Sequence, residues 1–287
     1  MKVLFTVFSA SGNTLRVAKL FSERLSERGA ECEIVRIRED MAAPDVASAD
    51  TLVIGYPVHG FNAPQNVADF AKGLPECENK VYYIIKTSGE PLHVNDASSR
   101  ILDRILKKKG YIKRGEFHYV MPYNMIFRHS DDMAALMWQA ARNTAPADAD
   151  KIFAGEEAQL KAGLLAVMTR FVVAVEHKAM PYLGRLFKVK KEKCISCGKC
   201  AKLCPMLNIE MKDGLPVFGK NCIGCTACSF NCPADAISIG VLNGWRVNGA
   251  YKFAPPREGL TRKDVCNYWR GSYIRYFREH GIELNKE

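Results

Sequence analysis

The first 125 residues alternate between short apolar runs and longer segments with helical periodicity. Residues 2–8 form an apolar, β-branched run, and Leu15, Ala18 and Phe21 then lie three residues apart within 13–29. A short continuous apolar run is typical of a buried strand, whereas the second pattern is typical of an amphipathic helix. The chain is therefore predicted to open with a strand and a helix.

The same alternation continues along the chain. Further strands are predicted at 31–37, 51–57, 80–87 and 115–122, and helices at 63–73 and 94–109. Strands that alternate with helices at this spacing indicate a parallel sheet with helices on both faces. We therefore expect an α/β fold with a doubly wound parallel sheet.

A helix-rich region follows at about 131–183, where apolar residues again recur at intervals of three and four. We expect its first helix to be an insertion at about 125–150. The helix at about 160–180 is then expected to complete the outer layer of the sheet. The basic stretch 185–193 is predicted to lead into a second domain.

Two similar cysteine phrases dominate the last third: KCISCGKCAKLCP at 193–205 and NCIGCTACSFNCP at 221–233. Each follows C-x2-C-x2-C-x3-C-P, the bacterial ferredoxin run in which the fourth cysteine ligates the other cluster. The pattern predicts two 4Fe-4S clusters. One set of ligands is Cys194, Cys197, Cys200 and Cys232, and the other is Cys204, Cys222, Cys225 and Cys228.

Structural zinc is the rival interpretation, but zinc sites typically pair two separated C-x2-C motifs. Gly198 and Gly224 are expected to let backbone amides approach the cluster sulfurs. Cys32, Cys77 and Cys266 stand alone in the sequence, and we expect them to be ordinary thiols.

Residues 193–240 resemble the bacterial two-cluster ferredoxins along their whole length. The resemblance implies a small α+β domain with two low-potential one-electron centres that lie close together. The tail, 241–287, extends beyond the ferredoxin pattern, and we expect it to fold back over one of the two domains.

The loop after the first predicted strand suits a phosphate group. Ser9, Ser11 and Thr14 offer hydroxyls, Gly12 permits close approach of the backbone, and the following helix offers its N-terminal amides. The loop is neither a Walker loop nor G-x-G-x-x-G.

In this position S-x-S-G-N-T resembles the flavodoxin phosphate loop. GYPVHGFNAPQ at 55–65 and TSGEPLHV at 87–94 lie where flavodoxins place their two ring-binding loops, and the resemblance covers about 1–125 and 160–180. It implies that FMN is bound, with its phosphate held by Ser9, Ala10, Ser11, Gly12, Asn13 and Thr14. It implies that the ring lies between two sets of residues: Pro57, Val58, His59, Gly60 and Phe61 on one side, and Ser88, Gly89 and Glu90 on the other.

The sequence departs from common flavodoxins in lacking a tryptophan at 57–61 and a tyrosine soon after Ser88. Phe61 or His59 could stack on the ring, or Tyr123 and Asn124 could reach it from the end of the fifth strand. Three alternatives stay open: His59 as an ordinary loop residue, Glu90 as a solvated charge, and a flavodoxin-like domain that binds no flavin.

The chain carries a formal charge of +10, concentrated in the stretches 185–193 and 262–280. Such stretches can bind nucleic acid or anionic membranes, but no nucleic-acid motif accompanies them, and we expect a face that docks an acidic redox partner.

The apolar stretch 164–175 is too short to span a membrane, and the N-terminus lacks a signal-peptide pattern. We therefore expect a cytoplasmic protein.

In this order the two parts resemble the flavodoxin–ferredoxin fusion proteins of anaerobic bacteria and archaea. The expected domains are 1–184, flavodoxin-like and FMN-binding; 185–240, a two-cluster ferredoxin; and 241–287, a basic C-terminal extension. The resemblance implies an electron-transfer protein that passes electrons between two 4Fe-4S clusters, FMN and external redox partners.

Two other functions remain. The chain could be an FMN-dependent reductase of a small acceptor, such as a quinone, oxygen or a metal ion, with His59, Glu90 or Tyr123 as proton donor. It could also be a redox-sensing interaction module. No acid–base constellation stands out in the sequence, so no catalytic residue is assigned.

Overall fold

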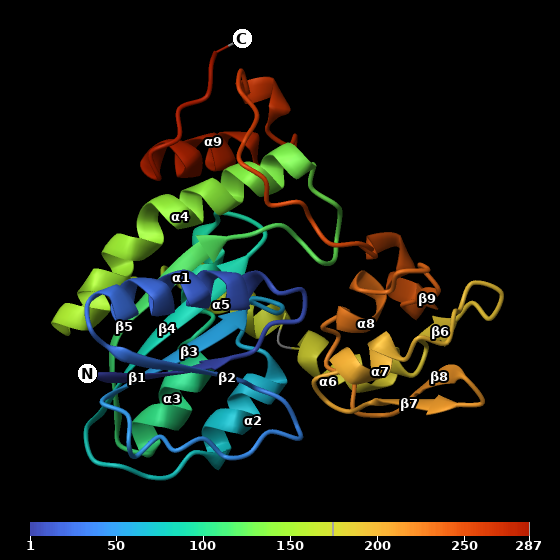
Figure 1. The fold of residues 1–287 in the computed structure, drawn as a ribbon, viewed down its shortest axis with the longest axis horizontal. Coiled ribbons are helices and arrows are strands. Elements are labelled where there is room, and N and C mark those ends of the chain that lie inside the picture. Colours follow the sequence, from blue (N-terminus) through green and yellow to red (C-terminus); the bar gives the residue numbers. More distant parts are fainter. Residues whose placement is uncertain (174, 287) are drawn as a thin grey trace.

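A parallel sheet forms the centre of the N-terminal part (Figure 1). The structure, a computed structural model, describes residues 1–173 and 175–286. The strands are β1 (Lys2–Val7), β2 (Glu31–Arg36), β3 (Thr51–Pro57), β4 (Lys80–Ser88) and β5 (Tyr111–Val120). Their order, β2-β1-β3-β4-β5, is that of the flavodoxin-like doubly wound fold. The expected fold class is confirmed.

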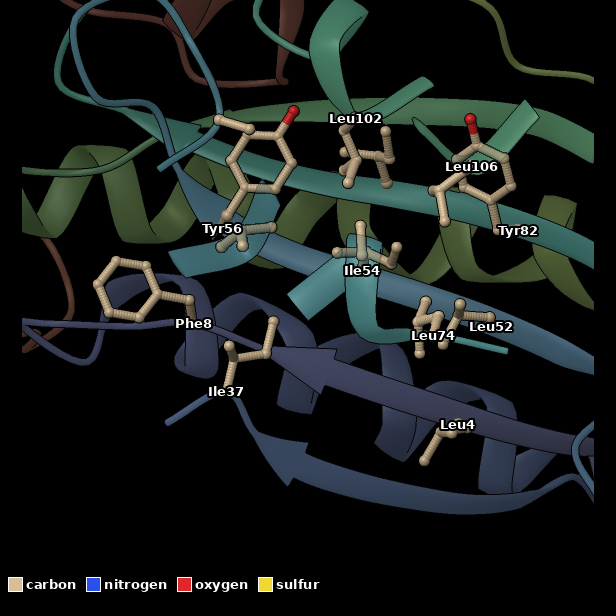
Figure 2. Packing of buried hydrophobic residues seen from close by; sticks show 14 of the residues in the cluster. Leu4, Phe8, Ile37, Leu52, Ile54, Tyr56, Leu74, Tyr82, Leu102 and Leu106 are labelled. Atoms are coloured by element: carbon tan, nitrogen blue, oxygen red, sulfur yellow. The ribbon is translucent and has the colours of Figure 1, made fainter. Parts of the chain in front are cut away.

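One face of the sheet is covered by α2 (Gln65–Gly73) and α3 (Arg100–Lys108). Ile54 and Tyr56 of β3 and Leu102 and Leu106 of α3 are buried together in this layer, as Figure 2 shows. Parallel strands buried on both faces read as continuous apolar runs, which is why β3 matches its predicted bounds.

The other face is covered by α1 (Asn13–Glu27) and α4 (Asp131–Ala154). Ala141, Ala145 and Ala149 of α4 share a buried cluster with Phe21 of α1. The expectation of an insertion at about 125–150 therefore differs from the structure, because α4 is itself the outer layer. A stripe of small alanines lets this helix lie close to its neighbours.

The helix expected at 160–180 is divided into α5 (Leu164–Val173) and α6 (Val175–Gly184). α5 packs against the short helix η1 (His93–Ala97), and the Arg170 carbonyl accepts a hydrogen bond from the Asn62 side chain at 3.2 Å. Since η1 and Asn62 follow β4 and β3, α5 lies at the carboxyl end of the sheet instead of completing its outer layer.

The cysteine-rich segment contains two small antiparallel sheets and two short helices. These are β6 (Lys188–Val189) with β9 (Ile237–Ser238), β7 (Ile209–Lys212) with β8 (Leu215–Phe218), α7 (Lys199–Leu203) and α8 (Ala227–Phe230). Phe187, Ile209 and Ile237 form its core together with cysteines from both phrases.

The tail runs from the cysteine-rich segment back onto the sheet domain (Figure 1). It contains η2 (Gly240–Trp245), η3 (Arg262–Asp264) and α9 (Arg270–Glu279). Tyr273 and Phe277 of α9 are buried against Met133 and Met137 of α4. The tail therefore ties the two parts of the chain together. Across the described residues, no helix combines the length and apolar character that crossing a bilayer requires.

Candidate cofactor sites

A cavity of about 580 Å³ lies at the carboxyl end of the sheet, where the loops after β1, β3 and β4 meet. In doubly wound folds this is where ligands bind. The predicted positions that line it are Ser9, Ala10, Ser11, Asn13, Thr14, Pro57, Val58, His59, Gly60, Phe61, Ser88, Gly89, Glu90, Tyr123 and Asn124. Gly12 is not in the lining; it takes φ 94° at the start of α1.

The loop after β1 is tightly organised around its hydroxyl groups. The Ser9 hydroxyl accepts a hydrogen bond from the Leu15 amide at 3.2 Å, and the Thr14 and Thr87 hydroxyls are 2.8 Å apart. Arg36 donates to the Ser9 carbonyl at 2.8 Å. Gly12, the N-cap residue of α1, has no side chain that could cap the helix, and Ser9 bonds to the Leu15 amide alone. The other first-turn amides of this helix are therefore suited to an anionic group.

The loop after β4 forms a buried polar wall. Glu90 is only 8% exposed and accepts a hydrogen bond from the Asn95 side chain at 2.9 Å and another from the Tyr123 hydroxyl. Ser88 donates to the Glu90 carbonyl at 2.8 Å and is also 2.8 Å from His118 Nε2. Burial raises the pKa of Glu90. The alternative of a solvated charge at Glu90 is therefore wrong.

Tyr123 lies directly over this loop. A Cβ atom at Gly89 would come within 2.2 Å of Tyr123 Cε1. The ring also stacks on His129, with centroids 5.2 Å apart and planes at 10°. Only glycine leaves room for so close an approach at position 89.

Several lining residues come from segments that the sequence did not indicate. Trp245 and Trp269 belong to the tail, Met180 and Leu183 to α6, and Ile223 and Gly224 to the second cysteine phrase. The two tryptophans are 55% and 60% exposed. The sequence offered one indirect sign that the tail reaches the cavity. The loops at 55–65 and 87–94 lack tryptophan, while the tail contains two.

The first predicted set of cysteines is brought together in space. Cys194, Cys197, Cys200 and Cys232 line one small pocket, although Cys232 comes from the second phrase. The Ala236 amide donates to the Cys232 sulfur at 3.3 Å. Cys197 is exposed, so this set lies at the molecular surface.

The second set lies deeper. Cys204, Cys225 and Cys228 are buried. Burial raises the pKa of Cys228, and the proximity of Cys225, Cys222 and Cys204 raises it further. The Asn208 and Gly224 amides donate to the sulfurs of Cys204 and Cys222 at 3.3 and 3.4 Å. Backbone amides near sulfur stabilise the charge of thiolate ligands, which fits an iron–sulfur cluster.

The cavity and the second set of cysteines share a wall. Ile223 and Gly224 line the cavity between Cys222 and Cys225. Asn124 donates from its side chain to the Cys225 carbonyl at 3.0 Å. At the end of α6, a Cβ atom at Gly184 would come within 2.1 Å of Cys222 Cβ. The cysteine loop itself therefore forms part of the cavity wall.

Comparison with known proteins identifies the cysteine-rich segment. Residues 187–239 match the family model described as a 4Fe-4S dicluster domain. Ferredoxin-3 of Nostoc sp. is 35% identical over 74 residues, a match that covers 19% of this chain and 76% of that protein. The chain belongs to the ferredoxin family. Of the two interpretations of the cysteines, the iron–sulfur one is confirmed for this ferredoxin segment.

A second relative matches the same family over a shorter part. An uncharacterized ferredoxin of Methanocaldococcus jannaschii is 41% identical over 49 residues, covering 16% of this chain. The chain spans only 32% of the length of that ferredoxin.

Solved flavodoxin structures are similar to the part of this ferredoxin-family chain that precedes the cysteines. The Streptococcus pneumonia TIGR4 flavodoxin has 17% identity and a TM-score of 0.41, covering 54% of this chain and 99% of the flavodoxin. Flavodoxin 1 of Bacillus cereus has 15% identity and a TM-score of 0.39, covering 54% and 98%. The strand order itself makes this part flavodoxin-like, so the chain joins a flavodoxin-like sheet to a ferredoxin segment.

Proposed function

We propose that the protein carries electrons between an external redox partner, two 4Fe-4S clusters and FMN. The observation that carries this proposal is the shared wall of Ile223 and Gly224, which lie between Cys222 and Cys225 and line the cavity. Redox centres on the two sides of this wall would be neighbours. Joining them in one chain replaces a chance encounter of two carriers by a fixed arrangement.

FMN fits the residues of the cavity. Its volume of about 580 Å³ lies within the usual range of cofactor sites, about 300–1,000 Å³. The residues from Ser9 to Thr14 would hold the phosphate, and Pro57–Phe61, Ser88–Glu90, Tyr123 and Asn124 would surround the ring. When bound, FMN supplies exchange of one or two electrons, whereas the protein supplies binding, orientation and electrostatics.

The two sets of cysteines would hold an outer and an inner cluster. Cys194, Cys197, Cys200 and Cys232 hold the outer cluster, near the exposed Cys197. Cys204, Cys222, Cys225 and Cys228 hold the inner cluster beside the cavity. Electrons then pass from the surface through both clusters to the cavity, or in reverse.

The surroundings of the outer cluster favour an acidic partner protein. Between residues 188 and 202 the exposed charged side chains are basic except for Glu192: Lys188, Lys190, Lys191, Lys193, Lys199 and Lys202. Asp235, nearby in space, is paired with Arg246. A partner with acidic residues around its own redox centre would be oriented on this surface.

The proposed domain bounds remain those expected from the sequence: 1–184, 185–240 and 241–287.

A small-acceptor reductase is the second candidate, and the buried acid Glu90 in the cavity wall favours it. The two functions differ in their need for a protein partner. The reduced chain is mixed with a quinone, oxygen or a ferric salt; rapid saturable turnover favours the reductase, and slow oxidation that an acceptor protein accelerates favours the carrier.

Cofactor content tests the proposal. We expect anaerobically purified protein to contain about eight iron atoms and to release FMN on denaturation. Cys266→Ser, at a lone cysteine, should leave both unchanged, whereas Cys225→Ser should lower the iron content. Protein that holds iron but no FMN, even after incubation with FMN, would contradict the flavin half of the proposal.

A further inference from the structure

Glu90 has an unusual position in the cavity. Among the described lining residues it is the one acidic side chain, and none of them is lysine or arginine. The described residues form no ion pair with it. Its carboxylate oxygens bond instead to two neutral groups, the Asn95 amide and the Tyr123 hydroxyl.

Other titratable groups surround Glu90 without pairing with it. His118 of β5 lies 2.8 Å from the Ser88 hydroxyl, which donates to the Glu90 backbone carbonyl. Lys86 of β4 donates to the carbonyls of Asn95 and Asp96 at 3.0 and 3.3 Å. Asp96 pairs with the exposed His93. From the tail, the Tyr273 hydroxyl donates to the Gly89 carbonyl and lies 3.2 Å from His129 Nε2.

An electron that enters the cavity adds negative charge beside this carboxyl group. Glu90 is buried and no lysine or arginine is among the described lining residues. Two negative charges repel strongly in such a place, so the added electron increases the proton affinity of a nearby carboxylate. Hydrogen bonds from Asn95 and Tyr123 stabilise the ionised form, while burial disfavours it and raises the pKa of Glu90. Glu90 can therefore change its protonation state without an ionic partner.

We propose that Glu90 takes up one proton when the redox ligand of the cavity accepts an electron, so that the potential of that ligand depends on pH through Glu90. The inference rests on the proposed function, because it requires FMN in the cavity and electrons from the inner cluster. Each electron would come from the inner cluster, which would be oxidised by one electron as the bound FMN accepted it. The proton comes from water and forms the O–H bond of the Glu90 carboxyl group.

The test uses the full-length protein with clusters and FMN. The midpoint potential of the bound FMN is measured against pH by spectroelectrochemistry in the wild type, Glu90→Gln and Asp96→Asn. Glutamine keeps the size of the side chain and an oxygen acceptor but cannot ionise. Asp96 is the matched control, because it is an acidic residue that directly follows Asn95, the hydrogen-bond partner of Glu90, but is not among the lining residues of the cavity.

We expect the Glu90→Gln and wild-type potentials to coincide at acidic pH, where Glu90 is neutral. They should diverge as the pH rises, the variant becoming more positive by up to about 59 mV for each tenfold fall in proton concentration. Asp96→Asn should follow the wild type with at most a constant offset. Parallel curves for Glu90→Gln and wild type would overturn the inference while leaving the proposed function intact.

Two further results keep the inference testable. If Glu90→Gln fails to hold FMN, Tyr123→Phe takes its place, because losing the hydroxyl donor should shift the steep region of the curve to higher pH. An unchanged Tyr123→Phe curve would then overturn the inference. A wild-type protein that binds no FMN contradicts the proposed function itself, and the two failures are therefore distinguishable.

Discussion

At the scale of single residues, Gly89 and Tyr123 pack against each other and together form one wall of the cavity. The tyrosine ring occupies the space that a side chain at position 89 would need, and its hydroxyl bonds to Glu90 in the same loop. The wall therefore depends on one glycine.

Gly89→Ala should destabilise the fold by about 1–3 kcal/mol, because the new methyl group overpacks against Tyr123. Urea unfolding followed by circular dichroism measures the change. Gly271→Ala is the control: it lies in α9 with no atom within 4 Å of the added carbon, and it should be neutral or stabilising by up to about 1 kcal/mol. Equal stability of Gly89→Ala and wild type would show that the wall is not closely packed.

His118 should make stability depend on pH. Burial lowers its pKa from 6.5 to about 3, so it is neutral in the folded chain but binds a proton in the unfolded chain below about pH 6.5. The stabilisation is present above that pH and is lost progressively as the pH falls toward 3.

The measurement compares urea unfolding of wild type and His118→Gln between about pH 5.5 and 7.5. Below about pH 6.5, the wild type should lose up to about 1.4 kcal/mol more per pH unit than the variant. Identical slopes would mean that His118 titrates alike in both states.

At the scale of elements, what could be predicted from the sequence depended on how each element is buried. β3 is buried on both faces, so its apolar run marked the strand correctly. α4 was predicted as a helix, but it packs through small alanines, and its sequence did not show that it belongs to the outer layer of the sheet. The meeting of three loops at one cavity could be anticipated, because the carboxyl ends of parallel strands share one edge.

Phe277 should anchor the tail to α4. Its side chain is fully buried between the two helices, so Phe277→Ala should lower the free energy of unfolding by about 3–5 kcal/mol. It should also weaken FMN binding, because α9 follows directly after Trp269 in the cavity wall. Arg278→Ala, exposed on the same helix, should change stability by no more than about 0.5 kcal/mol. Thermal unfolding and FMN titration give both values, and similar results for the two variants would contradict this role.

At the scale of the whole molecule, contacts between distant segments complete the site. Ile223, Gly224, Trp245 and Trp269 reach a cavity that is also lined by Ser9 in the loop after β1. Such contacts leave no local pattern in the sequence, which is why the cysteine phrases could be identified but their position against the loops at the carboxyl end of the sheet could not. The same arrangement leaves the outer cysteines at the surface, among exposed lysines.

Reversing the charge of Lys190, Lys191 and Lys193 to glutamate should slow electron exchange with an acidic two-cluster ferredoxin and weaken the dependence of the rate on salt. Lys107→Glu with Lys108→Glu, exposed on α3, is the control and should behave nearly as the wild type. Stopped-flow mixing over a range of ionic strength gives the rates. Equal slowing by both variants would place the docking surface elsewhere.

If electrons pass through the clusters to the cavity, the clusters must be reduced before the flavin, and rapid mixing can resolve this order. Anaerobic protein with clusters and FMN is mixed with a reduced acidic ferredoxin, and the cluster and flavin absorptions are followed together in a stopped-flow instrument. We expect the cluster absorption to fall first and to recover as the flavin absorption falls. Clusters that stay reduced beside an oxidised flavin, or a flavin reduced before the clusters, would contradict it.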